Sequence, residues 1–239
     1  MILLLQLFKF TLGLIVGSFI AALTYRYVRS ISNMHGRSFC DKCKKQIGWY
    51  DNIPFLSFLF LGGKCRNCRK KISPRYPLIE LSCAIGFLLI GFQVIPLALF
   101  CILAIIFIID FEHQIIPDTF IFLGILLSLL ITPHSLFSGL LAGFICATFL
   151  LLVHIITKGR GMGLGDVKFA VLGGIIVGLP LSPIWLFIAF LTGAIVGIIL
   201  ILGRRAGLKS KIAFGPFLVI AIPITLLWGQ KIIEIMLSH

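Results

Sequence analysis

The stretch LSCAIGFLLIGFQVIPLALFCILAIIFII, residues 81–109, decides how the chain is arranged. It carries no charge over 29 residues, which is long for one membrane-spanning helix of about 20 residues and short for two. Gly91 and Pro96 lie near its middle, and each is a residue at which a helix commonly ends or restarts. The sequence therefore predicts two short helices broken near Gly91 and Pro96, and the alternative is one continuous helix.

The composition places most of the chain in a membrane. Of 239 residues, 59% are hydrophobic and 12% are charged, and the mean hydropathy is +1.13. A soluble fold of this size cannot hide so much apolar surface, so we expect an all-α polytopic membrane protein. Further uncharged stretches are long enough for six more helices and span residues 10–25, 119–157, 169–203 and 212–230.

The basic residues set the orientation, because cytoplasmic loops collect Lys and Arg. Segment 26–75 carries twelve of the 21 basic residues and is expected in the cytoplasm, with the N-terminus outside. Two helices within 81–109 bring seven more basic residues to that side: Lys158, Arg160, Lys168, Arg204, Arg205, Lys209 and Lys211. We predict about eight transmembrane helices with both termini outside. Anionic lipid, rather than nucleic acid, then accounts for the net charge of +13.

One soluble segment divides the chain into three predicted parts: a first transmembrane helix over 1–25, a cytoplasmic loop over 26–76 and a membrane domain over 77–239. The loop holds CDKC at 40–43 and CRNC at 65–68, two pairs separated by 21 residues. Two such turns facing each other form the tetrahedral four-sulfur site that Zn²⁺ prefers. A redox dithiol or two disulfides are the alternatives, and a cytoplasmic location disfavours stable disulfides. The predicted structural zinc ligands are Cys40, Cys43, Cys65 and Cys68.

The remaining cysteines and the histidine at position 154 lie in predicted spans without partners at ligand spacing. Cys83, Cys101 and Cys146 are therefore expected to be small buried residues. His154 is expected to be a residue within a span or at the end of one. We identify no internal repeat in the sequence.

Two acidic residues stand out among the eight in the chain. Asp110 closes the uncharged run, and Asp166 follows the glycine-rich stretch GMGLG at 161–165. Ionisable groups at membrane depth are costly and are functional candidates by default. Two carboxylates that share a proton can divide the work, one deprotonating water and the other donating to a scissile carbonyl oxygen. Gly163 and Gly165 either loosen the backbone beside an extended peptide or only allow close helix packing.

These motifs resemble those of type IV prepilin peptidases, which are GxGD-type intramembrane aspartic proteases. Residues 163–166 match the family's GxGD motif, and IDFEHQIIPD at 109–118 matches its first aspartate block. The loop also agrees with the family, in both C-x-x-C pairs, WYDNIP at 49–54, GKCR at 63–66 and SPRYP at 73–77. The resemblance runs from Gly17 to about Lys168.

The resemblance implies that Asp110 and Asp166 are catalytic, with Gly163, Gly165 and Asp118 supporting them; Asp118 would cap or orient. It implies cleavage of the short basic leader of prepilins or pseudopilins after a Gly, at the cytoplasmic face of the bacterial inner membrane. Many members also methylate the new N-terminus with S-adenosylmethionine. Ala21 replaces a usual Asn in the first helix, which the family links to methylation, so this departure concerns methylation more than cleavage.

Two other classes of function stay open on the residues alone. Paired carboxylates also serve proton-coupled transporters, whose sites lie near the bilayer midplane between repeated halves. Both acids are predicted at one membrane face instead. A noncatalytic scaffold organised by the zinc loop would tolerate loss of either Asp110 or Asp166, so single substitutions separate these classes from a peptidase.

Overall fold

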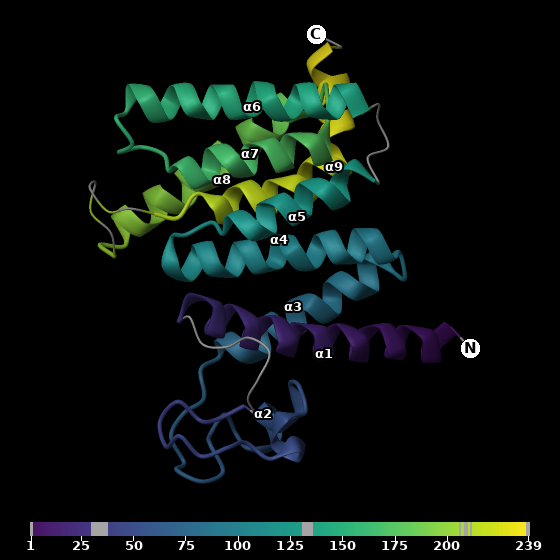
Figure 1. Cartoon of the computed structure of the whole chain (residues 1–239), viewed down its shortest axis with the longest axis vertical. Coiled ribbons are helices and arrows are strands. Elements are labelled where there is room, and N and C mark those ends of the chain that lie inside the picture. Colours follow the sequence, from purple (N-terminus) through teal and green to yellow (C-terminus); the bar gives the residue numbers. More distant parts are fainter. Residues whose placement is uncertain are drawn as a thin grey trace. The chain divides into compact units, whose positions relative to one another are not determined.

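The protein is built from helices (Figure 1). The computed structural model describes residues 2–29, 38–130, 136–205, 207, 210 and 212–237, and within them it contains no strand, only two isolated β-bridges. The helices are α1 (Ile2–Val28), η1 (Trp49–Asn52), α2 (Leu56–Phe60), α3 (Arg75–Ile90), α4 (Val94–His113), α5 (Asp118–Leu129), α6 (Leu136–Ile156), α7 (Leu164–Val177), α8 (Ser182–Leu202) and α9 (Gly215–Leu237). The predicted all-α class is confirmed. Residues 30–37 of the predicted loop, and Lys209 and Lys211, lie outside the described residues.

Five of the described helices are long and apolar enough to cross a membrane, namely α1, α4, α6, α8 and α9. Helices α3, α5 and α7 have 16, 12 and 14 residues. At 1.5 Å per residue they are about 24, 18 and 21 Å long, less than the roughly 30 Å of a hydrocarbon core. The structure therefore describes a multi-pass membrane protein with five candidate spans, and the predicted number of eight is not established by helix length.

The predicted break within 81–109 is confirmed. Helix α3 ends at Ile90, and Gly91 adopts φ +78°, a conformation that a residue with a Cβ rarely enters. The next helix, α4, begins at Val94, so Pro96 lies in its first turn, where a missing N–H costs no helical hydrogen bond. Gly91 therefore ends α3, and Pro96 is compatible with the first turn of α4.

The chain divides into two compact units, Met1–Ala104 and Ile105–His239, and the boundary falls within α4. In the first unit, α1 packs against α3 through two glycines of the sequence GLIVG. A Cβ built on Gly13 would lie 2.6 Å from Ala84 Cα, and one built on Gly17 would lie 2.7 Å from Glu80 Cα. Small residues four positions apart let membrane helices approach closely, and a larger residue at either position would force α1 and α3 apart.

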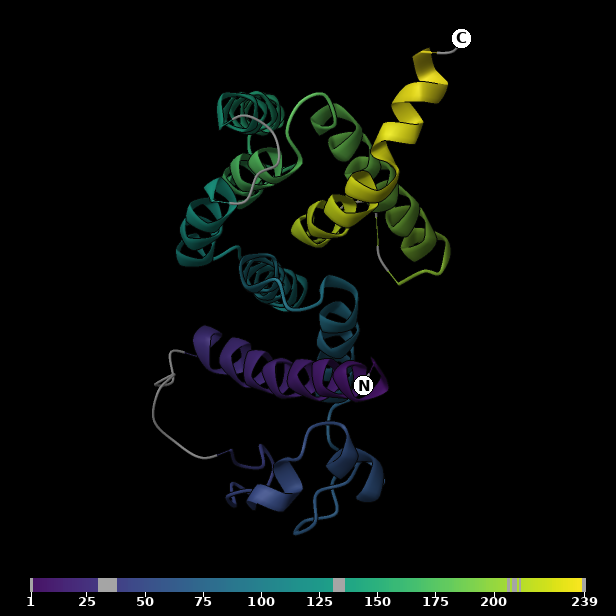
Figure 2. The ribbon, with the colours of Figure 1, turned by 90° about the vertical axis from the view of Figure 1, so that its right-hand side faces the viewer.

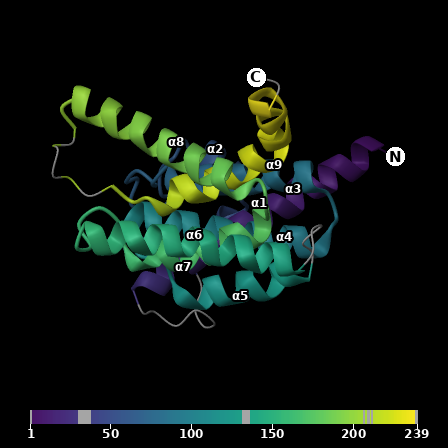
Figure 3. The same ribbon diagram turned by 90° about the horizontal axis from the view of Figure 1, so that it is seen from above.

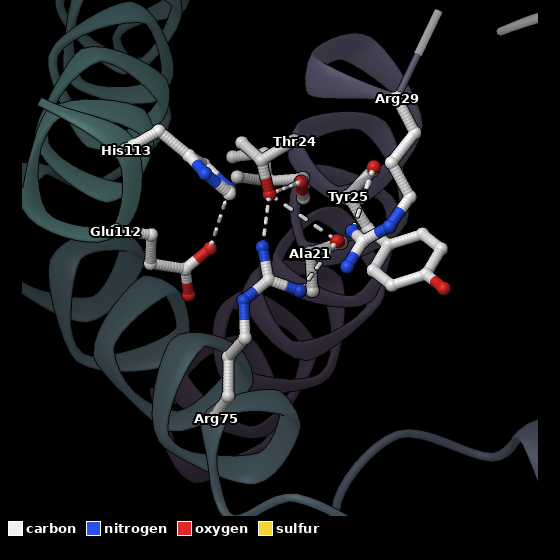
Figure 4. Close-up of polar contacts among 8 residues, drawn as sticks. Ala21, Thr24, Tyr25, Arg29, Arg75, Glu112 and His113 are labelled. Carbon is white, nitrogen blue, oxygen red and sulfur yellow. Dashed lines mark hydrogen bonds and ion pairs between the residues drawn. The ribbon is translucent and has the colours of Figure 1, made fainter. Parts of the chain in front are cut away.

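A buried polar contact joins the same two helices at the other end of the crossing (Figure 4). Arg75, the first residue of α3, donates from Nη2 to Thr24 Oγ1 at 2.7 Å and from Nη1 to the Ala21 carbonyl at 3.2 Å. Thr24 is 1% exposed, and its hydroxyl also donates to the Ile20 carbonyl at 2.9 Å, which leaves its oxygen free to accept from Arg75. The guanidinium therefore fixes the start of α3 against the last turns of α1.

In the second unit, the short helix α7 lies against α5, α6 and α9 (Figures 1 and 3). A Cβ on Gly174 of α7 would lie 2.6 Å from Gly143 Cα, so α6 and α7 meet backbone to backbone. Helices α8 and α9 cross each other (Figure 2), and Trp185 Nε1 donates to the Leu218 carbonyl at 2.9 Å between them. Helix α7 is thus surrounded by other helices, and its first turn is held in a fixed place.

Candidate active site and metal-binding loop

The four loop cysteines form one cluster in the first unit. Their Sγ atoms all lie within 4.8 Å of one another, and Cys40 Sγ is 3.9 Å from Cys68 Sγ. Four sulfurs at about 2.3 Å from a tetrahedral Zn²⁺ would be about 3.8 Å apart. The contact between Cys40 and Cys68 joins the two pairs, which favours one four-sulfur site over two separate dithiols. All four thiols are free.

The two halves of this cluster repeat each other. Cys40 N–H donates to the Lys45 carbonyl and Lys44 N–H to the Cys40 carbonyl, and the same pair of bonds recurs 25 residues later around Cys65. Lys44 and Arg69 take the same left-handed conformation, at φ 59° and 57°. The prediction that the sequence has no internal repeat is wrong on this short scale, and the missed signal is the shared pattern C-x-x-C-[KR]-K-x-I.

The thiols differ in how readily they ionise. Burial opposes ionisation of Cys40, but the backbone N–H groups of Cys43 and Lys42 and the neighbouring thiols outweigh it and lower the pKa of Cys40 to about 7. The backbone N–H of Lys70 favours the thiolate of Cys68, whereas burial and hydrogen bonds with the other thiols raise the pKa of Cys68 to about 11. One sulfur of the cluster is therefore ready to bind a cation, and binding would displace the protons from the others.

An ion pair braces the loop independently of the cysteines. Arg66, within the second C-x-x-C turn, binds the Asp51 carboxylate with both Nε and Nη2 at 2.7 to 3.0 Å. Its guanidinium also lies over the ring of Tyr50, 5.4 Å from the centroid. The two-pronged geometry makes this pair stronger than an ordinary surface ion pair, so it holds η1 against the second turn.

A cavity of about 1400 Å³ lies between the loop, α1 and α3. Tyr25 Oη donates to Asp41 at 2.7 Å on one side of it. On another side Glu80, 6% exposed, accepts the Phe55 N–H at 2.7 Å and so stabilises that residue in a left-handed conformation, φ 61°. Sequence reasoning missed Glu80, although an acid in an apolar helix is itself the signal that singled out Asp110.

Asp110 lies in the last turn of α4 and is 4% exposed. Its Oδ2 atom is buried and accepts no hydrogen bond of ordinary geometry from the described residues, although the Gly215 N–H lies close to the carboxyl. The start of α9 passes directly beside it, since a Cβ built on Gly215 would lie 2.5 Å from Oδ2. Buried carboxylate oxygens are almost always paired, so an oxygen without a well-formed hydrogen bond in the folded protein indicates a functional group.

Asp166 lies in the first turn of α7 and is 7% exposed. Its Oδ2 accepts the Gly163 N–H at 3.0 Å, and Gly163 is the extended residue that precedes the helix, at φ −80°. The backbone does leave helical geometry before Asp166, as one of the two interpretations of the glycines expected. Gly165 allows a close contact with the link between α4 and α5, since its Cβ would lie 3.1 Å from Ile116 Cβ.

The second unit brings together the helix ends that carry the two acids. Asp110 lies beside Gly215, and Asp166 follows Gly165. The side chain of Ile116 lies against two glycines, because a Cβ built on either Gly165 or Gly215 would lie 3.1 Å from it. The end of α4 and the starts of α7 and α9 therefore meet around one residue, and both predicted acids are buried in these turns.

Asp118 does not act as a helix cap. The residue before α5 is Pro117, and no side chain caps the helix. Asp118 instead binds Lys168 Nζ through both carboxylate oxygens, at 2.7 and 2.8 Å, on the protein surface. This pair joins the first turns of α5 and α7, two residues beyond Asp166, which agrees with an orienting role. In the last turn of α4, His113 Nε2 lies 3.8 Å from Glu112 Oε2 (Figure 4).

The fold and the site define a polytopic membrane protein that buries two carboxylates. Two family models match it: the bacterial peptidase A24 N-terminal domain over residues 11–94 and the type IV leader peptidase family over residues 97–198. Proteins named prepilin leader peptidase/N-methyltransferase align with most of the chain. That of Pseudomonas putida is 30% identical, covering 92% of this chain and 90% of its own. That of Aeromonas salmonicida is 36% identical, covering 84% and 75%.

The chain therefore belongs to the type IV leader peptidase family, and it is a protease. A third relative, from Pseudomonas aeruginosa, agrees at 31% identity over 92% of this chain and 89% of the relative. No solved structure matches the chain. Family membership confirms the resemblance carried by the two aspartate motifs and does not favour a proton-coupled transporter.

Proposed function

We propose that the protein is a membrane aspartic endopeptidase that removes the short basic leader from type IV prepilins or pseudopilins, after a Gly. Asp110 and Asp166 would be the catalytic pair. The observation that carries the proposal is the buried carboxyl of Asp110, with one oxygen that accepts no hydrogen bond of ordinary geometry from the described residues, beside a second buried carboxyl. Two interacting acids of this kind can hold one proton between them and activate water without a metal or a covalent intermediate.

We assign the roles of the two acids from the hydrogen bond at Asp166. Gly163 N–H favours the carboxylate of Asp166, which suits this residue to take a proton from water. The hydroxide so formed attacks the scissile carbonyl carbon, while Asp110 donates its proton to the carbonyl oxygen. As the tetrahedral intermediate collapses, one of its hydroxyl groups returns a proton to Asp110, the C–N bond breaks, and the proton held by Asp166 passes to the leaving amine. Both acids then return to their starting states.

We propose the arrangement in the membrane from the distribution of the Lys and Arg residues along the chain. The described part of the chain holds eight longer helices, α1 and α3 to α9. If each crosses the inner membrane once and both termini lie outside, the loop faces the cytoplasm and Asp110 and Asp166 both fall at the cytoplasmic end of a helix. The corresponding domains are the first helix over 1–25, the loop over 26–76 and the peptidase over 77–239. Prepilin and anionic lipid are the proposed partners.

The four cysteines are proposed to hold one structural Zn²⁺, which would supply folding energy to a loop too small for a core of its own. A second activity is proposed from the relatives, whose names include N-methyltransferase. The chain would methylate the new N-terminus with S-adenosylmethionine as donor. Ala21, fully buried and bonded through its carbonyl to Arg75, is where the first helix departs from the family pattern.

The test is cleavage of a prepilin by the protein in proteoliposomes, followed by mass spectrometry of the product N-terminus. Asp110→Asn and Asp166→Asn keep the shape of the side chains and remove the transferable proton, so each should abolish cleavage with normal membrane insertion. Substantial cleavage by either variant would refute the catalytic pair. The same spectra report methylation as a mass increase of the mature N-terminus, so the two activities are read separately.

A further inference from the structure

His154, in the last turn of α6, contacts the backbone that leads to Asp166. Its Nδ1 atom lies 2.7 Å from the Met162 carbonyl oxygen. A carbonyl only accepts hydrogen bonds, so Nδ1 must carry a hydrogen and donate it. The acceptor is well enclosed, since Met162 is 5% exposed. A contact of this length in a partly buried place is a specific hydrogen bond.

The turn between α6 and α7 is folded around the same ring. Gly159 N–H donates to the His154 carbonyl at 2.8 Å and takes φ +72°. A Cβ built on Gly159 would lie 3.2 Å from His154 Cε1, so the turn closes directly over the imidazole. Thr157, at the start of the turn, donates from Oγ1 to the Val153 carbonyl at 2.7 Å, and this bond ties the turn to the last turns of α6. The ring therefore has one orientation, with Nδ1 toward Met162.

The bonded carbonyl and the N–H that holds Asp166 belong to one peptide group. Met162 supplies its carbonyl, which His154 binds, and Gly163 supplies its N–H, which donates to Asp166 Oδ2 at 3.0 Å. A peptide group is planar, so fixing the carbonyl fixes the direction of the N–H. Donation to the carbonyl also polarises the group and strengthens the bond that its N–H makes.

We infer that His154 is a positioning residue for Asp166, acting through the Met162–Gly163 peptide. This inference rests on the proposed catalytic role of Asp166. The imidazole acts on Asp166 through this peptide, and no step of the reaction is assigned to it. It holds the peptide plane that aims and stabilises the carboxylate taking the proton from water, so its loss should lower the rate of the chemical step more than substrate binding.

The test uses two nearly isosteric replacements. In His154→Asn the amide nitrogen takes the place of Nδ1 and keeps the donor, whereas His154→Leu has a similar shape without a donor. Leu is the better helix former, so a purely structural role would favour it over Asn. We expect kcat for prepilin cleavage to fall roughly tenfold in His154→Leu with KM unchanged, and to stay within about threefold of the wild type in His154→Asn.

Equal activity of the two variants, or a loss confined to KM, would overturn the inference. If His154→Leu does not accumulate in the membrane, His154→Gln replaces it, since its longer amide places the donor away from Met162. Asp166→Asn is measured in the same series. Activity in Asp166→Asn would refute the proposed function itself, whereas an inactive Asp166→Asn beside a fully active His154→Leu would refute only the role of His154.

Discussion

Gly215 offers a direct test of the site, because its hydrogen faces Asp110. In Gly215→Ala the new methyl would lie 2.5 Å from Asp110 Oδ2 and 3.1 Å from Ile116 Cδ1, whereas ordinary contacts begin at 3.4 Å. The carboxyl and the start of α9 must therefore separate by about 0.9 Å. A catalytic group misplaced by about 1 Å costs roughly 100-fold in rate, or about 2.7 kcal/mol of activation free energy. We expect a loss of that order in kcat.

The assay is the initial rate of prepilin cleavage in proteoliposomes, with membrane insertion and thermal stability measured on the same preparations. Gly197→Ala is the matched control, because the nearest atom to its new Cβ would be 3.8 Å away. This control should cleave at the wild-type rate and gain slightly in helix stability. Wild-type activity in Gly215→Ala would mean that the packing of α9 against Asp110 is not part of the active site, and the geometric argument would fail.

Three further outcomes are expected. Purified protein should carry one Zn²⁺ per chain, and Cys43→Ser should lose the metal in elemental analysis, expose the loop to protease and lower cleavage only partly; full activity without zinc would contradict this. Asp118→Asn should keep cleavage within about threefold, because an exposed ion pair with Lys168 contributes about 1 kcal/mol or less, and a loss as severe as that of Asp166→Asn would place Asp118 among the catalytic groups. A single cysteine at Ser73, in a chain without other thiols, should be labelled from the cytoplasm, and labelling from outside would reverse the orientation.

The features predicted correctly from the sequence are those that depend on residues close together in the chain. The break at Gly91 follows from an uncharged run too long for one helix, and the cysteine cluster follows from the spacing of two C-x-x-C pairs. Asp110 and Asp166 were identifiable because acids are rare in an apolar chain. Their meeting in one buried site was a hypothesis that only tertiary packing around Ile116 could support.

The features that were missed depend on contacts between distant residues. Nothing near Asp118 in the sequence indicates that it binds Lys168, fifty residues away, in place of capping α5. Likewise, His154 is an unremarkable polar residue at the end of an apolar run until the turn over residues 157–162 folds back onto it. The number of spans stays a prediction, since charge-free length does not indicate that α5 and α7 have only 12 and 14 residues.

The shortness of α5 and α7 has a consequence for the surrounding lipid. In the proposed eight-span arrangement these neighbouring helices, about 18 and 21 Å long, face a hydrocarbon layer of about 30 Å. Such hydrophobic mismatch is relieved by local thinning of the bilayer. Thinning would bring the headgroup region, and with it water, toward the first turn of α7, where a hydrolase needs it. The acyl-chain length of the membrane then becomes part of what sets the enzyme's rate.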